Sequence, residues 1–180
     1  MFLIFDTETT GLPKDYKAPI QDTDNWPRMV QLSWQLHDEN GKLLEVQDFI
    51  VKPEGFNIPF NATKIHGVST KRALEEGHEL KFVLEEFNKS LEKAEYNIGH
   101  NVGFDINIVG CEAVREDFET ALHEKLVLDT CSEVTANYCK IPGGRGGKFK
   151  LPKLMELHDF LFNESFNEAH NAAFDVEATS

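Results

Sequence analysis

Apolar and polar positions along the chain switch between strand-like and helix-like spacing, which is typical of an α/β domain. Residues 2–5 form a continuous apolar run that ends in polar residues and a glycine, as expected for a strand buried on both faces. Residues 29–37 alternate apolar and polar side chains, Asn40-Gly41 follows, and residues 43–51 resume an extended pattern. Because Asn-Gly between two such runs is a strong hairpin signal, we predict two antiparallel strands beside the first.

The second half of the pattern adds helices and two short strands. Residues 79–91 carry apolar side chains at helical spacing, which predicts a helix packed on the sheet. Residues 61–66 can form one helical turn that Gly67 ends, and this places the ring of His66 at the surface. The remaining predicted elements are strands at 96–100 and 126–130 and helices at 132–138 and from Pro152 onward.

Length and composition indicate one soluble globular domain. The chain has 180 residues, of which 41% are hydrophobic, enough for a substantial core. Three cysteines without a CxxC pair are expected to be reduced, and the N-terminus lacks the pattern of a signal peptide or membrane span, so we expect a cytoplasmic protein without membrane contact. The last predicted helix has few residues left before Ser180, which suggests a single domain over residues 1–180, truncated in that helix.

Asp6 and Glu8 follow directly on the first apolar run. Because side chains alternate along a strand, these two carboxylates emerge on one face while Thr7 points away. Like charges this close disfavour joint ionisation unless a cation lies between them, and Mg²⁺ prefers such oxygen ligands. The pair therefore predicts half of a metal site, although a solvated Asp-x-Glu at a strand end is the alternative for these residues alone.

Two more aspartates are predicted near the same edge of the sheet. Asn101 and Asn171 are good N-caps, so Asp105 and Asp175 would lie in the opening turns of two helices, over the crevice where open α/β sheets bind ligands. A helix-start charge that stabilises the dipole is the alternative for each. If His170 and Asp175 were on the same helix, five residues apart, their side chains would point in different directions. We therefore expect His170 to project from the loop that precedes the helix.

Two loops and the net charge bear on the substrate. Residues 12–28 form a long loop beside the first carboxylates, either a rim that substrate touches or decoration. Residues 140–150 are glycine-rich and basic, which is typical of a mobile loop, and the alternative hypothesis is that Arg145 and Lys148 contact a phosphate backbone. The net charge of −13 argues against tight duplex binding, but two divalent ions among the carboxylates would reverse the local field.

Three motifs in order resemble those of the DEDD-type 3′-to-5′ exonucleases of the histidine subgroup, the family that includes the proofreading epsilon subunit of bacterial DNA polymerase III. They are FDTETTGL (Phe5 to Leu12), HNVGFD (His100 to Asp105) and HNAAFD (His170 to Asp175). The resemblance implies an α/β, ribonuclease H-like fold with a five-stranded mixed sheet flanked by helices. It also implies two Mg²⁺ or Mn²⁺ ions held by Asp6, Glu8, Asp105 and Asp175.

The implied activity is release of nucleoside 5′-monophosphates from the 3′ end of single-stranded DNA, in proofreading or repair and with a DNA polymerase subunit as partner. The resemblance assigns the general base to His170, which spacing alone cannot distinguish from His100. An exoribonuclease of the same family and a non-catalytic nucleic-acid-binding module are the alternatives. Expected substrate contacts are Thr7, Thr10, Gly11, Leu12, His66, His100, Asn101, Phe104, Arg145 and Lys148.

Overall fold

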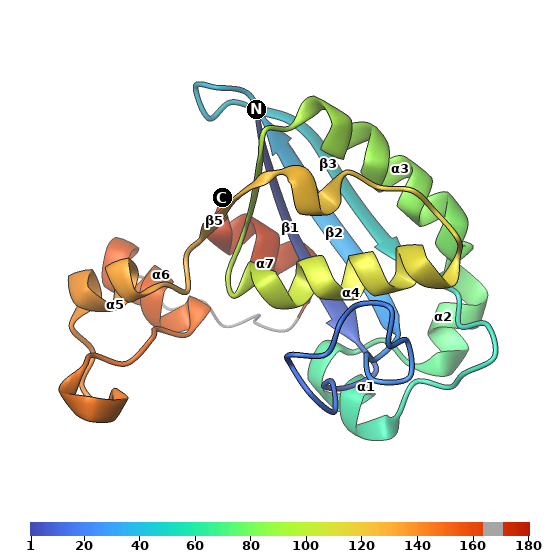
Figure 1. Ribbon diagram of the computed structural model, residues 1–180, viewed down its shortest axis with the longest axis horizontal. Helices are drawn as coiled ribbons and strands as arrows, with labels where there is room; N and C mark the ends of the chain where they lie inside the picture. The colour runs from blue at the N-terminus through green and yellow to red at the C-terminus, as the bar shows by residue number, and fades with distance from the viewer. Residues whose placement is uncertain (164–170) are drawn as a thin grey trace.

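Five strands form one mixed sheet in the computed structural model, which describes residues 1–163 and 171–180 (Figure 1). The central strand β1 (Phe2–Thr9) pairs antiparallel with β2 (Met29–His37) and parallel with β4 (Tyr96–Gly99). Outside these, β3 (Leu43–Ile50) pairs antiparallel with β2, and β5 (Leu126–Asp129) parallel with β4. The predicted hairpin and mixed sheet are confirmed, and the carboxyl ends of β1, β4 and β5 meet at one edge.

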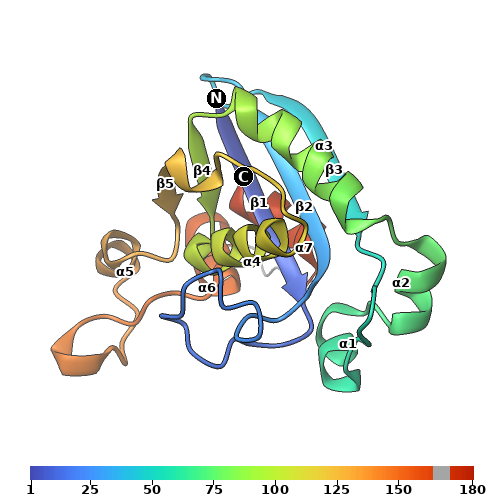
Figure 2. The same cartoon turned by 45° about the vertical axis from the view of Figure 1, so that its right-hand side comes forward.

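Helices cover both faces of this sheet (Figures 1 and 2). The long helices α3 (Leu80–Lys93) and α4 (Val102–Arg115) pack on one face, and α7 (Ala172–Thr179) packs on β1 and β2 from the other. No helix in the described part of the chain is long and apolar enough to cross a membrane. The remaining elements are α1 (Phe60–His66), α2 (Thr70–Glu76), η1 (Leu122–Glu124), α5 (Glu133–Cys139), η2 (Arg145–Gly147) and α6 (Leu154–Phe162).

The main core lies between the sheet and the α3/α4 layer. Leu3 and Phe5 are fully buried there, together with Trp34 of β2 and Phe87 of α3. The rings of Phe5 and Phe87 pack edge to face with centroids 5.1 Å apart. Because alternate residues of β1 share a face, Thr7 continues this buried row, whereas the side chains of Asp6 and Glu8 lie on the α7 face.

The loop over residues 12–28 is packed onto α4. Trp26 is buried in the main core. The buried carboxylate of Glu112 accepts hydrogen bonds from the backbone N of Met29 at 2.7 Å and from Nε of Arg28 at 3.0 Å, and Arg115 lies 3.0 Å away. A charge buried this deeply is tolerated because it is paired and hydrogen-bonded, so the end of the loop is tied to α4.

Candidate active site

Asp6, Glu8 and Asp175 form a cluster at the carboxyl end of β1. Asp6 and Glu8 share one face of the strand, as predicted, and Asp175 reaches them from the first turn of α7. The predicted N-cap of that helix is confirmed, since Asn171 accepts a hydrogen bond from the backbone N of Ala173 at 3.1 Å. One carboxylate oxygen from each of the three acids lies within 4.8 Å of the others. This spacing allows one cation to contact all three.

Asp105 approaches the same strand from the opposite face. It lies in the first turn of α4, as predicted, and only 3% of its surface is exposed. Its Oδ1 accepts hydrogen bonds from the backbone N of Thr7 at 2.9 Å and from the Thr7 hydroxyl at 2.6 Å. Thr7, expected to contact substrate, is itself buried, so its hydroxyl positions Asp105.

Burial and mutual repulsion raise the pKa values of these carboxyls. Burial is the main cause of a strongly raised pKa at Asp6, and the neighbouring acids add to it. Burial, and then the charge of Asp175, raises the pKa of Glu8 to about 8. Burial also raises the pKa of Asp105 to about 7, against the lowering effect of the Thr7 hydrogen bonds. The raised pKa values mean that the ionised forms of these acids are unfavourable in the metal-free fold. Hard divalent cations prefer oxygen ligands and would stabilise those ionised forms.

A cavity of about 550 Å³ opens beside Glu8. His66 lines it, and the prediction of an exposed ring was wrong, because only 4% of this residue is exposed. His66 follows Ala62 by four residues and therefore lies on the buried face of α1. Its Nδ1 accepts a hydrogen bond from the backbone N of Val68 at 3.2 Å, and burial lowers the pKa of His66, which favours the neutral form of the ring. The cavity also collects predicted substrate residues from two motifs: Thr7, Thr10, Gly11, Leu12 and Phe104.

A second cavity, of about 620 Å³, lies beside Asp6 and Asp175. Leu12 lines this cavity as well as the first, so the two meet there and flank the carboxylate cluster. Residues 151–155 form much of its wall. Lys153 also lines this cavity, and the sequence analysis did not predict it as a site residue. The available signal was a basic residue directly after Pro152 and close to the basic loop.

The second motif contributes two residues to this second cavity. The ring of His100 is held at both nitrogens, with Nε2 3.0 Å from the carbonyl of Pro152 and Nδ1 2.9 Å from the Thr130 hydroxyl. Burial lowers the pKa of His100. A ring engaged at both nitrogens is suited to holding the cavity wall in place. Asn101 precedes α4, but its predicted side-chain cap is wrong: its φ is 64°, and its backbone N donates to Asp129 Oδ1 at 2.8 Å.

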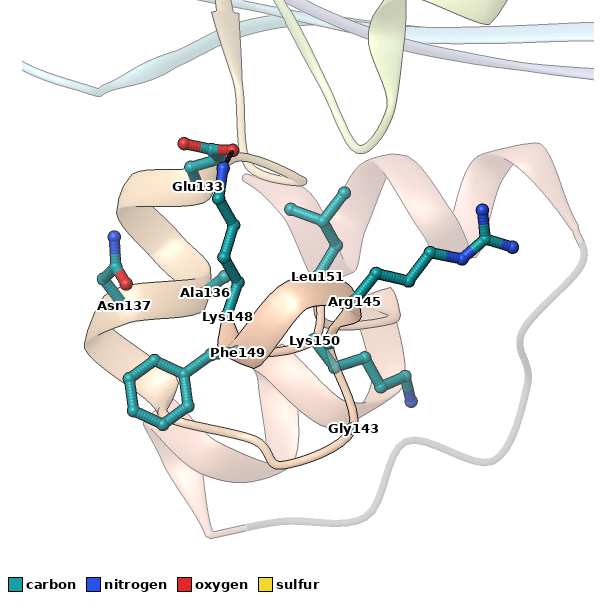
Figure 3. A pocket seen from close by; sticks show the side chains of 10 residues that line it. Glu133, Ala136, Asn137, Gly143, Arg145, Lys148, Phe149, Lys150 and Leu151 are labelled. Atoms are coloured by element: carbon teal, nitrogen blue, oxygen red, sulfur yellow. Dashed lines mark hydrogen bonds and ion pairs between the residues drawn. The ribbon is translucent and has the colours of Figure 1, made fainter.

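The remaining three predicted site residues are not among those that line the two cavities beside the acids as the structure describes them. His170, the expected general base, is outside the described residues. Arg145 and Lys148 line a third cavity, between α5 and residues 143–151, which Figure 3 shows. Lys148 forms an ion pair with Glu133 at 2.5 Å.

The mixed sheet and its flanking helices form a ribonuclease H-like fold, with the acidic cluster at the carboxyl edge of the sheet. A profile of the RNase_T exonuclease family matches residues 3–180, and the chain belongs to this family. A comparison with curated protein sequences found no significant match.

Solved structures of E. coli exonuclease I share the fold. A complex with a dA16 oligonucleotide superposes with a TM-score of 0.73 at 22% identity, over 99% of this chain and 38% of that chain. A complex with a dT13 oligonucleotide gives a TM-score of 0.75 at 22% identity, over 99% and 39%. A zinc-bound form of the complex with single-stranded DNA gives 0.74 at 24% identity, over 99% and 38%. The chain thus spans less than two fifths of the length of each of these structures.

Proposed function

We propose that this domain is a metal-dependent 3′-to-5′ exonuclease that releases nucleoside 5′-monophosphates from single-stranded DNA. The observation that carries the proposal is the meeting of Asp6, Glu8 and Asp175 within 4.8 Å in a member of an exonuclease family. Mutually repelling, half-buried acids destabilise a fold unless they bind something, which disfavours a purely structural or non-catalytic role. The four predicted carboxylates are the proposed ligands of two Mg²⁺ or Mn²⁺ ions, and Asp105 is the fourth of these carboxylates.

Each residue of the proposed site has its own role in the reaction. When bound, the metal ions supply an acidified water and stabilisation of the leaving 3′ oxygen. Thr7 holds the carboxylate of Asp105 in place through two hydrogen bonds. The cavity at His66 and Phe104 receives the 3′-terminal nucleoside, since a neutral imidazole and a phenyl ring offer it a mostly uncharged wall. We assign to His170 the removal of a proton from the attacking water.

The substrate and setting form the finer part of the proposal. The similar structures of E. coli exonuclease I contain dA16 and dT13 oligonucleotides, which supports single-stranded DNA as substrate. The motif resemblance to the epsilon subunit supports a proofreading or repair role in the cytoplasm, with a DNA polymerase subunit as partner. An exoribonuclease is the second candidate, because the same carboxylates serve either sugar.

The test is digestion of 5′-end-labelled single-stranded DNA and RNA of one sequence in Mg²⁺, Mn²⁺ or EDTA. We expect a ladder shortened from the 3′ end that EDTA abolishes, with DNA degraded faster than RNA. Asp6→Asn should stop cleavage, whereas Asp24→Asn, the same change at an exposed loop position, should not. Faster RNA cleavage would favour the exoribonuclease, and binding without cleavage would favour the non-catalytic module.

A further inference from the structure

The basic loop over residues 140–150 folds back on itself and encloses a cavity of about 460 Å³ against α5 (Figure 3). Its base is closed by a hydrogen bond from the backbone N of Lys150 to the carbonyl of Ile141, at 2.8 Å. Gly144 is packed so closely that a Cβ there would lie 2.3 Å from the carbonyl oxygen of Phe149. Any larger residue would force the loop open, so the sequence specifies this shape and the loop is more than a basic excursion.

The charges around the cavity leave one cation available. Lys148 is paired with Glu133 at 2.5 Å and Lys150 with Glu156 at 2.6 Å. Arg145 is exposed, and its guanidinium has no hydrogen bond or ion pair among the described residues. In Figure 3 this guanidinium extends away from Glu133. On a chain with a net charge of −13, a free guanidinium is an unusual feature, and its planar fork matches phosphate oxygens.

An aromatic side chain completes the lining. Phe149 is 40% exposed and lies at the opposite side of the cavity from Arg145 in Figure 3. Proteins that bind single strands without sequence preference combine a cation that tracks the backbone with an aromatic ring on which a base stacks. The cavity presents one of each.

Position relates this cavity to the carboxylate cluster. Leu151 lines both this cavity and the 620 Å³ cavity beside Asp6 and Asp175, which in turn shares Leu12 with the cavity at His66. The three cavities therefore form a row: the cavity at His66, the 620 Å³ cavity in the middle and the cavity at the basic loop. The acids lie between the cavity at His66 and the middle cavity. The middle cavity is large enough for a nucleotide-sized ligand, so at least one nucleotide separates the acids from Arg145.

From this row we infer a distal subsite for the single strand: Arg145 binds a backbone phosphate, and Phe149 stacks on a base, upstream of the bond that is cleaved. The inference rests on the proposed function, because it takes the 3′ end to occupy the cavity at His66. It predicts that affinity depends on strand length, since only a strand long enough to cross the middle cavity reaches Arg145.

The experiment measures binding of oligodeoxythymidylates from two to twelve nucleotides in EDTA, at 50 and 200 mM salt. For the long strands, Arg145→Gln should weaken binding about eightfold at 50 mM and about threefold at 200 mM, lowering the salt slope by about 0.7. The dinucleotide should bind both proteins equally. Lys81→Gln, the same charge change at an exposed position of α3, should leave every affinity unchanged. Phe149→Leu should weaken long strands without changing the salt slope.

Two outcomes would overturn the subsite: equal weakening by Arg145→Gln at all lengths, or no weakening at any length. Because binding is read in EDTA, the result is independent of cleavage. A length-dependent loss in a protein that cleaves nothing in Mg²⁺ would reject the exonuclease while keeping the phosphate contact. Cleavage in Mg²⁺ without any length-dependent loss of binding would reject the phosphate contact while keeping the exonuclease.

Discussion

At the scale of single residues, the acids of the cluster make stability depend on pH. The pKa of Glu8 rises from 4.5 in the unfolded chain to about 8 in the fold. Between these values the folded protein holds a proton that the unfolded chain has released, so each increase in pH favours unfolding. The stabilising contribution is therefore complete below about pH 4.5 and lost as pH passes 8.

We predict that the melting temperature of the metal-free protein falls from pH 5 to pH 8, and that Glu8→Gln falls less steeply because its side chain does not titrate. Thermal unfolding in EDTA across this range measures both slopes. Asp24→Asn provides the control at an exposed acid, with a slope equal to that of the wild type. Identical slopes for the wild type and Glu8→Gln would show that Glu8 titrates normally.

A second prediction at this scale concerns Thr7, whose hydroxyl donates to Asp105 at 2.6 Å. Thr7→Val keeps the shape and the backbone donor but removes a hydrogen bond that lowers the pKa of Asp105. We expect kcat/KM to fall roughly tenfold, the loss of one charge-assisted hydrogen bond, and the acidic limb of its pH profile to move to higher pH. Thr120→Val, whose hydroxyl bonds Asn88 far from the acids, is the matched control. An unmoved acidic limb would contradict a positioning role for Thr7.

At the scale of elements, the interaction of α4 with the loop over residues 12–28 depends on Glu112. Glu112→Gln would leave Arg28 and Arg115 without the carboxylate that neutralises them, so we expect a loss of roughly 3 kcal/mol in the free energy of unfolding. Urea unfolding measures it, with Glu119→Gln, an exposed acid beyond the same helix, as control. A cost equal to that of the control would mean that the buried charges are dispensable.

The elements themselves were largely predictable because their signals are local. The apolar run before Asp6, the Asn-Gly turn and the helical spacing before Leu91 each specify structure within a few residues. The burial of His66 was not predictable, since it depends on a small core that Val30 and Val68 form from distant segments. The ion cluster around Glu112 was missed for the same reason, because Arg28 and Glu112 are 84 residues apart in the sequence.

The candidate site was predictable where strand and helix geometry decide it. Alternation along β1 placed Asp6 and Glu8 together, and capping placed Asp175 in an opening turn. The side from which Asp105 approaches, and the row of cavities from Leu12 to Leu151, depend on how α4 and the segment before α6 pack on the sheet. Local pattern contains no information on that packing.

At the scale of the whole molecule, the site joins the first strand to the last helix. Asp6 and Asp175 are separated by nearly the entire sequence, and their carboxylates meet only when α7 is docked on β1. A cation bound between them would therefore stabilise the docked helix, because ligands that bind only the folded state shift the equilibrium toward it by mass action.

We predict that Mg²⁺ slows backbone hydrogen exchange in α7 and raises the melting temperature, by an amount equivalent to about 2.7 kcal/mol at a hundredfold excess over Kd. Mass spectrometry of peptides from residues 171–180, in Mg²⁺ and in EDTA, provides the measurement. Asp175→Asn should abolish both effects, because the helix then lacks its ligand. Asp159→Asn on α6 should retain both effects, as it removes an exposed carboxylate from a neighbouring helix. Protection that is equal in the two variants would place the cation somewhere other than between β1 and α7.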